Sequence, residues 1–346
     1  MKEMFFVTGA NGHLGFNICQ ILRANKYHVR GLIIDSDSPR RLEELGVEVF
    51  RGDVTKPHTL SSFFANIEPD TTSYLIHTAG IVSITNKNLN VLYRVNFEGT
   101  KNVIKSAKEA RIDRIVYVSS VHAIPENKDN DVIIEPTFFD ENLVVGEYAK
   151  TKAITSKYVK NQAKKGLDIV LVHPSGIIGP GDQGHGHLTM MVEDYLNGLL
   201  TSRVKGAYDF VDVRDVAQGT IQAALKGKKG ESYILSGHLI DLSQFFEVLR
   251  KLSGKNTIIN VLPTWFARIS APLAELYYKL LRKPPIYSKY SLYTIQSNAQ
   301  FSYLKAQNVL DYSPRPFEET IKATMKWLLT EGRIKKKKVA NFVKKY

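Results

Sequence analysis

Two side chains of this 346-residue chain, Tyr148 and Lys152, are four positions apart at the start of a predicted helix. That spacing puts both on one face of the helix. A free tyrosine titrates at about pH 10, and a nearby ammonium group favours its phenolate. Such a pair can exchange a proton with a carbonyl or alcohol oxygen. With 17 tyrosines in the chain the spacing also arises by chance. Whether the pair is catalytic or structural therefore depends on where it lies in the fold.

A hydroxyl group is expected close to this pair. Ser120 follows an apolar run, residues 115–119, which predicts a central strand. In open parallel sheets, ligands collect outside the carboxyl ends of the strands. The Ser120 hydroxyl is therefore placed to bond a substrate oxygen, and the structural alternative is a serine that caps a turn.

A glycine-rich turn opens the chain between an apolar run, residues 4–7, and a helical pattern that begins near Leu14. Residues 8–15 read TGANGHLG. Glycines permit a sharp turn whose N–H groups, with the positive end of the helix dipole, can approach a pyrophosphate. A second β-like run, residues 28–34, follows at the distance that a βαβ unit requires. The turn predicts a dinucleotide site, although glycines also cluster in turns that bind nothing.

The elements that must position these groups alternate along the first half of the chain. Helices are predicted over 89–110 and over 148–165, the second ending before Gly166. Six apolar runs predict strands, at residues 4–7, 29–34, 47–50, 73–77, 115–119 and 169–173. Continuous apolar runs between amphipathic helices indicate a parallel sheet buried on both faces. The predicted fold class is α/β, a doubly wound parallel sheet of the Rossmann type.

Beyond Pro174 the pattern changes, with five glycines between residues 176 and 186 and then a helix predicted over 188–199. We expect residues 1–175 to form mainly the dinucleotide-binding domain. Residues 176–330 are expected to form mainly a smaller substrate-binding lobe, interleaved with the first domain. Residues 331–346 are a basic tail.

The formal net charge of +13 does not by itself indicate nucleic-acid binding. The tail carries +6 of it, and acidic residues are interspersed through the mildly basic body. We expect no nucleic-acid partner. A frayed terminus is the expected state of the tail, and contact with an anionic membrane or nucleic acid is the alternative.

Other features of the sequence indicate the cellular compartment and whether the protein associates with a membrane. The single cysteine, Cys19, excludes an internal disulfide and agrees with a reducing compartment. No signal peptide precedes the first strand, and no run approaches the roughly 18 apolar residues of a membrane span. We expect a cytoplasmic protein without stable membrane insertion. Apolar residues at helical spacing over 265–281 predict a helix that packs on the lobe, at the mouth of the site or on a partner, with an amphipathic membrane helix as the alternative.

The motifs together resemble those of the extended short-chain dehydrogenases/reductases, the NAD-dependent epimerase/dehydratase superfamily. The matching segments are TGANGHLG at 8–15, GDVT at 52–55, HTAG at 77–80, VNFEGT at 95–100, Ser119 with Ser120, Tyr148 with Lys152, and HPSGIIGPG at 173–181. Later segments, FVDVRDVA at 210–217, FSYLKA at 301–306 and LDYSPRP at 310–316, resemble the branch of dihydroflavonol reductases and 3β-hydroxysteroid dehydrogenases.

This resemblance implies a role for each matching residue. Ser120 would orient the substrate oxygen, Tyr148 would act as general acid/base, and Lys152 would tune Tyr148 while binding the cofactor ribose. The remaining cofactor-binding residues that it implies are Gly9, Asn11, Gly12, His13, Leu14 and Gly15 at the pyrophosphate, Asp53 and Val54 at the adenine, Thr78, Ala79, Gly80 and Asn96 along the groove, and Pro174, Ser175 and Gly176 at the nicotinamide.

The choice between NAD(H) and NADP(H) depends on the end of the second strand, where an acid binds the ribose of NAD or an arginine pairs with the 2′-phosphate of NADP. Ile33 and Ile34 stand at the usual positions. Asp35 comes slightly late for the first role, and Arg40 and Arg41 are near enough for the second. The two arginines favour NADP(H), and NAD(H) stays the alternative.

The substrate is expected to be a small carbonyl or alcohol. Sugar-nucleotide epimerases of the superfamily place an arginine just before the segment that begins at Phe210, and this chain has Tyr208 and Asp209 there. His122, His185 and Tyr208, with His187, are candidates to face the substrate, and no residue spacing suggests a metal site.

The sequence thus predicts an NAD(P)-dependent oxidoreductase. Its alternatives are a nucleotide-sugar epimerase or dehydratase and a dinucleotide sensor without turnover. The resemblance also implies a homodimer.

Overall fold

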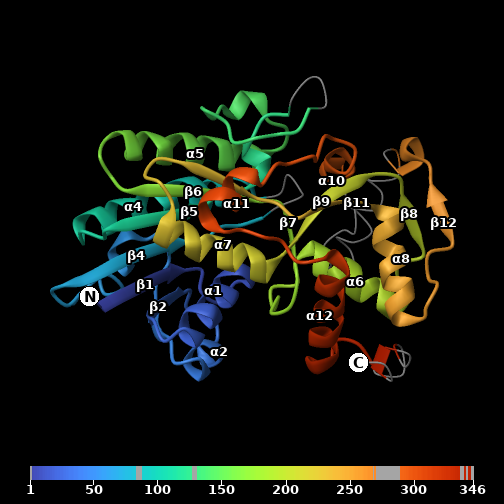
Figure 1. The fold of residues 1–346 in the computed structure, drawn as a ribbon, viewed down its shortest axis with the longest axis horizontal. Coiled ribbons are helices and arrows are strands. Elements are labelled where there is room, and N and C mark those ends of the chain that lie inside the picture. The colour runs from blue at the N-terminus through green and yellow to red at the C-terminus, as the bar shows by residue number, and fades with distance from the viewer. Residues whose placement is uncertain are drawn as a thin grey trace.

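A computed structural model describes residues 2–82, 88–126, 131–267, 269, 289–335, 339 and 342–343. Its centre is a sheet of seven parallel strands in the order β10-β6-β5-β4-β1-β2-β3 (Figure 1). The strands are β1 (Lys2–Thr8), β2 (His28–Ile33), β3 (Glu48–Arg51), β4 (Thr71–His77), β5 (Arg114–Val118), β6 (Ile169–Pro174) and β10 (Ser232–Leu235). The doubly wound parallel sheet is confirmed. Strands β1 to β6, the first six along the chain, coincide with the six predicted runs.

Helices cover both faces of this sheet. One face carries α1 (His13–Ala24), α2 (Arg40–Glu44), α7 (Val213–Lys226) and α11 (Leu304–Leu310), and the other carries α4 (Thr100–Glu109) and α5 (Glu147–Lys164). The helix predicted over 89–110 consists of α3 (Leu89–Tyr93), a π-helical turn over Arg94–Gly99, and α4. Helix α5 ends before Gly166, which has a φ of +107° as a C-terminal glycine permits.

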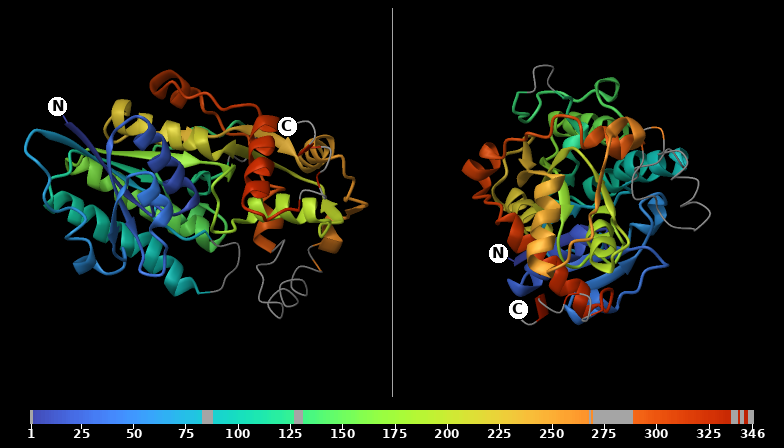
Figure 2. Two further views of the ribbon diagram at one scale, coloured as in Figure 1. Left: turned by 90° about the horizontal axis from the view of Figure 1, so that it is seen from below. Right: turned by 90° about the vertical axis from the view of Figure 1, so that its right-hand side faces the viewer.

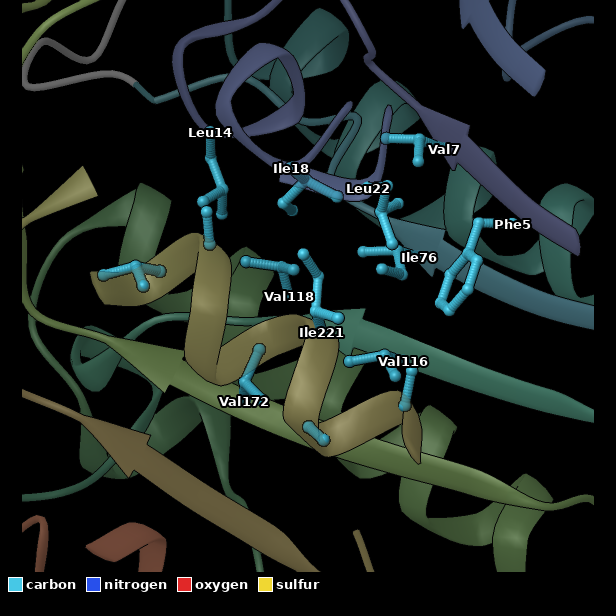
Figure 3. Close-up of a cluster of buried hydrophobic side chains, with 14 of the residues drawn as sticks. Phe5, Val7, Leu14, Ile18, Leu22, Ile76, Val116, Val118, Val172 and Ile221 are labelled. Carbon is cyan, nitrogen blue, oxygen red and sulfur yellow. The ribbon is translucent and has the colours of Figure 1, made fainter. Parts of the chain in front are cut away.

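Strand β1 shows why its residues read as a continuous apolar run. Phe5 and Val7 face α1 and α7, whereas Met4 and Phe6 face the layer of α4 and α5, and all four are buried. Figure 3 shows the first of these cores, in which Ile18 of α1 and Ile221 of α7 lie over the sheet. Successive side chains of a strand point to opposite faces of the sheet. Because both faces are buried here, apolar residues are favoured at every one of these positions.

A second lobe adjoins the carboxyl ends of the strands. Its elements are β7 (Gly176–Ile178), β8 (Ser202–Val204), β9 (Ala207–Asp212), β11 (His238–Asp241), β12 (Asn260–Leu262), α6 (His187–Asn197), α8 (Leu242–Ser253), α10 (Lys289–Thr294) and α12 (Phe317–Thr330). Strands β11, β9 and β7 form one sheet and β12 and β8 another, with a separate apolar core under α6, α8 and α12 (Figures 1 and 2). Although β10, α7 and α11 follow residue 176 in the sequence, they pack on the main sheet.

Several segments for which the sequence makes predictions lie partly or wholly outside the described residues. Of the segment 265–281 the structure describes only 265–267 and 269, where Trp265 and Phe266 are exposed. The lysines at 336–338 and 344–345 of the basic tail lie outside the described residues. No helix in the described part of the chain is long and apolar enough to span a membrane.

Candidate active site

The glycine-rich turn joins β1 to α1 through a left-handed residue and close backbone contacts, both of which favour glycines. Gly9 has a φ of +65°, and its carbonyl oxygen accepts a hydrogen bond of 2.9 Å from the Gly12 N–H. A Cβ on Gly15 would lie 2.2 Å from the same oxygen. The turn therefore packs directly on the first turn of α1, where none of the described side chains caps the helix and no acidic residue stands. An uncapped helix start of this kind is suited to an anionic group such as a pyrophosphate.

Other predicted residues of the turn make contacts away from α1. The His13 ring bonds the Pro180 carbonyl oxygen at 3.1 Å, and Asn11 donates through Nδ2 to the Ser38 carbonyl oxygen at 3.2 Å. Oδ1 of Asn11 is buried and has no hydrogen-bond partner among the described residues. It is thus one of the polar atoms here that a ligand would satisfy.

Hydrogen bonds hold the carboxyl ends of β1 and β4 together. Thr8 Oγ1 bonds His77 Nδ1 at 2.6 Å, and His77 Nε2 bonds Thr100 Oγ1 at 3.0 Å. Burial lowers the pKa of His77 to about 3, so the ring is neutral and serves as a structural link. Thr78 donates to the Thr8 carbonyl oxygen at 2.7 Å, which places Ala79 against Gly9.

Asn96 fixes the segment that follows β4. Its side chain accepts from the Ile81 N–H at 2.8 Å and donates to the Ile81 carbonyl oxygen at 3.0 Å and to Thr151 at 3.1 Å. A Cβ on Gly80 would lie 3.2 Å from Asn96 Oδ1 and 3.6 Å from Lys152 Nζ. The segment from Thr78 to Gly80, which is predicted to line the cofactor groove, therefore lies between the glycine-rich turn and Lys152.

Ser120, Tyr148 and Lys152 meet at the carboxyl end of β5, and all three are buried. Lys152 donates to the Val118 carbonyl oxygen at 2.9 Å, and its ammonium lies over the Tyr117 ring. Burial raises the pKa of Tyr148 to about 12, against a hydrogen bond with Ser120 that lowers it. Burial likewise lowers the pKa of Lys152 to about 8. Near neutral pH the site therefore holds a neutral phenol, which is a proton donor, beside a largely charged ammonium group.

The structure brings two of the four predicted substrate-facing residues, His122 and Tyr208, together and separates His185 from them, while His187 begins α6. His122, two residues after Ser120, bonds the Tyr208 hydroxyl at 2.8 Å, and its ring lies 5.9 Å from that of Tyr148. His185 instead lies with Arg333, whose guanidinium is 2.8 Å from its Nδ1. Tyr290 of α10, which the sequence did not single out, also bonds His122, at 3.3 Å.

Asp53 and Val54 follow β3. The Asp53 carboxylate accepts two hydrogen bonds of 2.8 Å from Thr55, and Val54 is buried. Desolvation raises the pKa of Asp53, but these hydrogen bonds outweigh it and the net shift is downward. An ionised carboxylate therefore stands at the predicted adenine end of the groove.

The segment predicted to border the nicotinamide, Pro174 to Gly176, is tied to the second lobe through Asp209. Ser175 Oγ donates to the Asp209 carboxylate at 2.5 Å, and the Gly237 N–H donates to it at 2.8 Å. Asp209 is buried, and desolvation raises its pKa to about 6. This carboxyl group belongs to the junction of the lobes and is not open to a ligand.

A pH-dependent effect on stability follows from Asp209. Its pKa rises from 3.8 in the unfolded chain to about 6, so folding favours the protonated form. This shift alone should lower the free energy of unfolding by about 2 kcal/mol as the pH rises from 4 to 7, whereas buried histidines with a lowered pKa, such as His77, act in the opposite direction. Asp209→Asn keeps a side-chain oxygen but has no charge, so between pH 4 and pH 7 the free energy of unfolding of the variant, measured by chemical denaturation, should rise by about 2 kcal/mol relative to that of the native protein. Equal slopes for both proteins would contradict the assignment.

The residues that follow β2 occupy distinct environments. Arg40 is exposed and pairs with Glu44 at 2.8 Å, and Asp35 is exposed. The Arg41 guanidinium lies 3.7 Å from the centre of the Phe16 ring in α1. Its Nη1 is buried and has no partner in the described part of the chain. Arg41, more than Arg40, is thus a cation directed at the start of α1.

The described residues contain no group of three or more His, Cys, Asp or Glu side chains that could hold a metal ion. What they do contain is an uncapped helix start at α1, the segment from Thr78 to Gly80 beside it after β4, and a phenol with a lysine at the end of β5. Comparison with known proteins agrees with this arrangement. Residues 5–236 match the model of the NAD dependent epimerase/dehydratase family. The chain belongs to this family.

Similar proteins cover nearly the whole length of the chain. Sterol demethylase protein B of Methylococcus capsulatus is 28% identical over 95% of this chain and 99% of its own. A dihydroflavonol 4-reductase-like protein of Synechocystis is 28% identical over 97% of both chains. The crystal structure of gox2253, 28% identical, superposes with a TM-score of 0.82 over 96% of this chain and 99% of its own. The predicted extended short-chain dehydrogenase/reductase resemblance is confirmed.

Proposed function

We propose that this chain is an NAD(P)-dependent oxidoreductase that reduces a ketone or aldehyde, or oxidises the matching alcohol. The observation that carries the proposal is the buried neutral phenol of Tyr148 beside Ser120 and Lys152. When bound, the nicotinamide coenzyme supplies or accepts the hydride. Reductase chemistry also agrees with the name of the Synechocystis relative.

The chain's own residues divide the remaining work. The Ser120 hydroxyl orients the reacting oxygen, and the Tyr148 O–H gives that oxygen its proton in the direction of reduction. The Lys152 ammonium stabilises the phenolate that remains, from a position fixed by its hydrogen bond to the Val118 carbonyl oxygen. In the direction of oxidation the same proton moves back to Tyr148.

The lining of the neighbouring pocket favours this reaction over work on a nucleotide sugar. The pocket extends from His122 and Tyr208, and its described lining residues include no lysine or arginine. A sugar diphosphate would leave two negative charges there without a cationic partner. Net consumption of NAD(P)H with a carbonyl substrate supports an oxidoreductase, and turnover without net consumption supports an epimerase.

We further propose that the coenzyme is NADP(H). Arg41 offers an unpartnered buried N–H beside the start of α1, and a 2′-phosphate would satisfy it. NAD would instead require a carboxylate at the end of β2 to bind its ribose. In the structure Ile33 and Ile34 occupy these positions, and Asp35 is exposed to solvent.

Arg41→Met tests this preference. It keeps an apolar stem against Phe16 and removes the charge, so we expect the Kd for NADPH to rise about tenfold or more, and the Kd for NADH to stay nearly constant. Fluorescence titration with both coenzymes measures the ratio. Arg40→Met should change this ratio far less, because that side chain is exposed and paired with Glu44. An unchanged ratio in the Arg41 variant would show that the 2′-phosphate lies elsewhere.

A further inference from the structure

His122 joins the catalytic strand to two tyrosines of the second lobe. It lies just after β5, where its backbone N–H donates to Ser120 Oγ at 3.2 Å. Its Nε2 is 2.8 Å from the Tyr208 hydroxyl of β9, and its Nδ1 is 3.3 Å from the Tyr290 hydroxyl of α10. Both ring nitrogens of one histidine are thus engaged by phenols, a few ångströms from the proposed proton donor.

The protonation of His122 fixes the direction of these two hydrogen bonds. Burial lowers the pKa of His122 to about 4, so the ring is neutral and has one donor and one acceptor nitrogen. A distance of 2.8 Å is typical of O–H donation, and the longer 3.3 Å suits a weaker N–H donation. We assign the shorter bond as donation from the Tyr208 hydroxyl to Nε2, which leaves Nδ1–H to donate to the oxygen of Tyr290. The hydroxyl proton of Tyr290 is left free for another acceptor.

Tyr290 is held against the catalytic helix. Its ring packs on Gly146, immediately before α5, where an added Cβ would lie 2.3 Å from the ring. Gly146 also has a φ of +96°, so a glycine is required there on both grounds. Burial, and then the neighbouring Tyr148, raise the pKa of Tyr290, which keeps its proton in place. A second phenolic O–H thus stands close to that of Tyr148.

The pocket that continues from His122 has both apolar and polar walls. Its apolar lining includes Val121, Ile133 and Phe301, and its uncharged polar lining includes Tyr208, Thr294, Ser297 and Asn298. The only charged residue among the described lining residues, Glu126, accepts a hydrogen bond of 2.7 Å from Tyr293. Such walls accept an uncharged substrate body that carries polar groups and offer no cation to an anionic one.

We propose that Tyr290 determines substrate specificity by donating a hydrogen bond to a second oxygen of an uncharged ketone or alcohol. His122 is the positioning residue that aims this donor, and Tyr208 anchors His122. The inference rests on the proposed oxidoreductase function and adds the substrate class: an uncharged carbonyl compound with a second oxygen away from the reacting one.

Turnover of a decalone and of its isomeric decalindiones by the coenzyme-loaded enzyme tests the proposal, because each dione differs from the monoketone by one oxygen. We expect the native enzyme to prefer at least one dione. Tyr290→Phe keeps the ring against Gly146 and removes the donor, so kcat/KM for that dione should fall about tenfold, with little change for the decalone. His122→Leu should lose the same selectivity, and the double variant should lose no more than either single variant.

Tyr74→Phe is the matched control, because the Tyr74 hydroxyl donates to Glu3 on the main sheet. It is not part of the contacts around His122. It should leave the preference intact. Equal losses for the decalone and the dione in Tyr290→Phe, no change in their ratio, or a native enzyme that binds coenzyme but prefers no dione would each overturn the inference. A protein that captures no coenzyme would instead overturn the proposed function, so the two failures are distinguishable.

Discussion

Tyr148→Phe is expected to lower turnover by about 10² to 10⁴ and to leave coenzyme affinity close to that of the native protein. The substitution removes one hydroxyl from a buried ring and keeps the edge contact with His122. Only the proton of the phenol and its hydrogen bond with Ser120 are lost. Steady-state kinetics with a carbonyl substrate, together with a coenzyme titration, measures both quantities.

Tyr158→Phe provides the control on the same helix. Tyr158 lies ten residues further along α5 and packs edge-on against Phe97, away from the carboxyl end of β5. Its variant should keep native turnover. If Tyr148→Phe also keeps native turnover, Tyr148 is not the proton donor, and equal losses in both variants would point to damage to the helix.

Gly15→Ala is expected to weaken coenzyme binding by about a hundredfold. The new Cβ would lie 2.2 Å from the Gly9 carbonyl oxygen and 2.9 Å from its carbon, so the turn and α1 must move apart. The N–H groups at the start of α1 would then no longer converge on one anion. Loss of one or two hydrogen bonds to a charged group costs about 3 kcal/mol, which corresponds to this change in Kd.

Gly184→Ala is the comparison for this variant. The nearest atom to its added Cβ, Asp182 Oδ1, would be 3.6 Å away, an ordinary contact, and the backbone φ is not in the left-handed region. Its coenzyme affinity should equal that of the native protein. Circular dichroism must first show that Gly15→Ala is folded. A folded Gly15→Ala protein with native affinity would mean that the turn does not hold the pyrophosphate.

The sheet was predictable because its strands are buried on both faces. In such strands most residues are apolar, as Met4 to Val7 show, and the runs stand out from the helices between them. Strand β10 was missed because it is short, begins with the buried polar Ser232, and lies in the second half of the chain, where strands and helices do not alternate regularly. The long connection before β10 also hides its return to the main sheet.

The site was predictable where its residues belong to local motifs. Ser120, Tyr148 and Lys152 follow from a strand end and a helical spacing, and the structure places them together. Tyr290 could not be found in this way, because 168 positions separate it from His122 and no motif surrounds it. The close approach at Gly146 gives a signal only once the fold is known.

Local electrostatics was the least predictable feature. The spacing of Lys152 from Tyr148 suggested a stabilised phenolate, but burial is the larger effect and raises the pKa of Tyr148 to about 12. Likewise, Arg40 and Arg41 are equivalent in the sequence. Because neighbouring residues of a helix point in different directions, only Arg41 reaches Phe16.

Isothermal titration calorimetry of the native protein with NADPH and with NADH tests the central claim most directly, since the proton donor has a role only if a nicotinamide coenzyme lies along the groove from Gly9 to Lys152. The account predicts saturable binding of one coenzyme per chain, tighter for NADPH. Binding of neither coenzyme by the folded protein would contradict it.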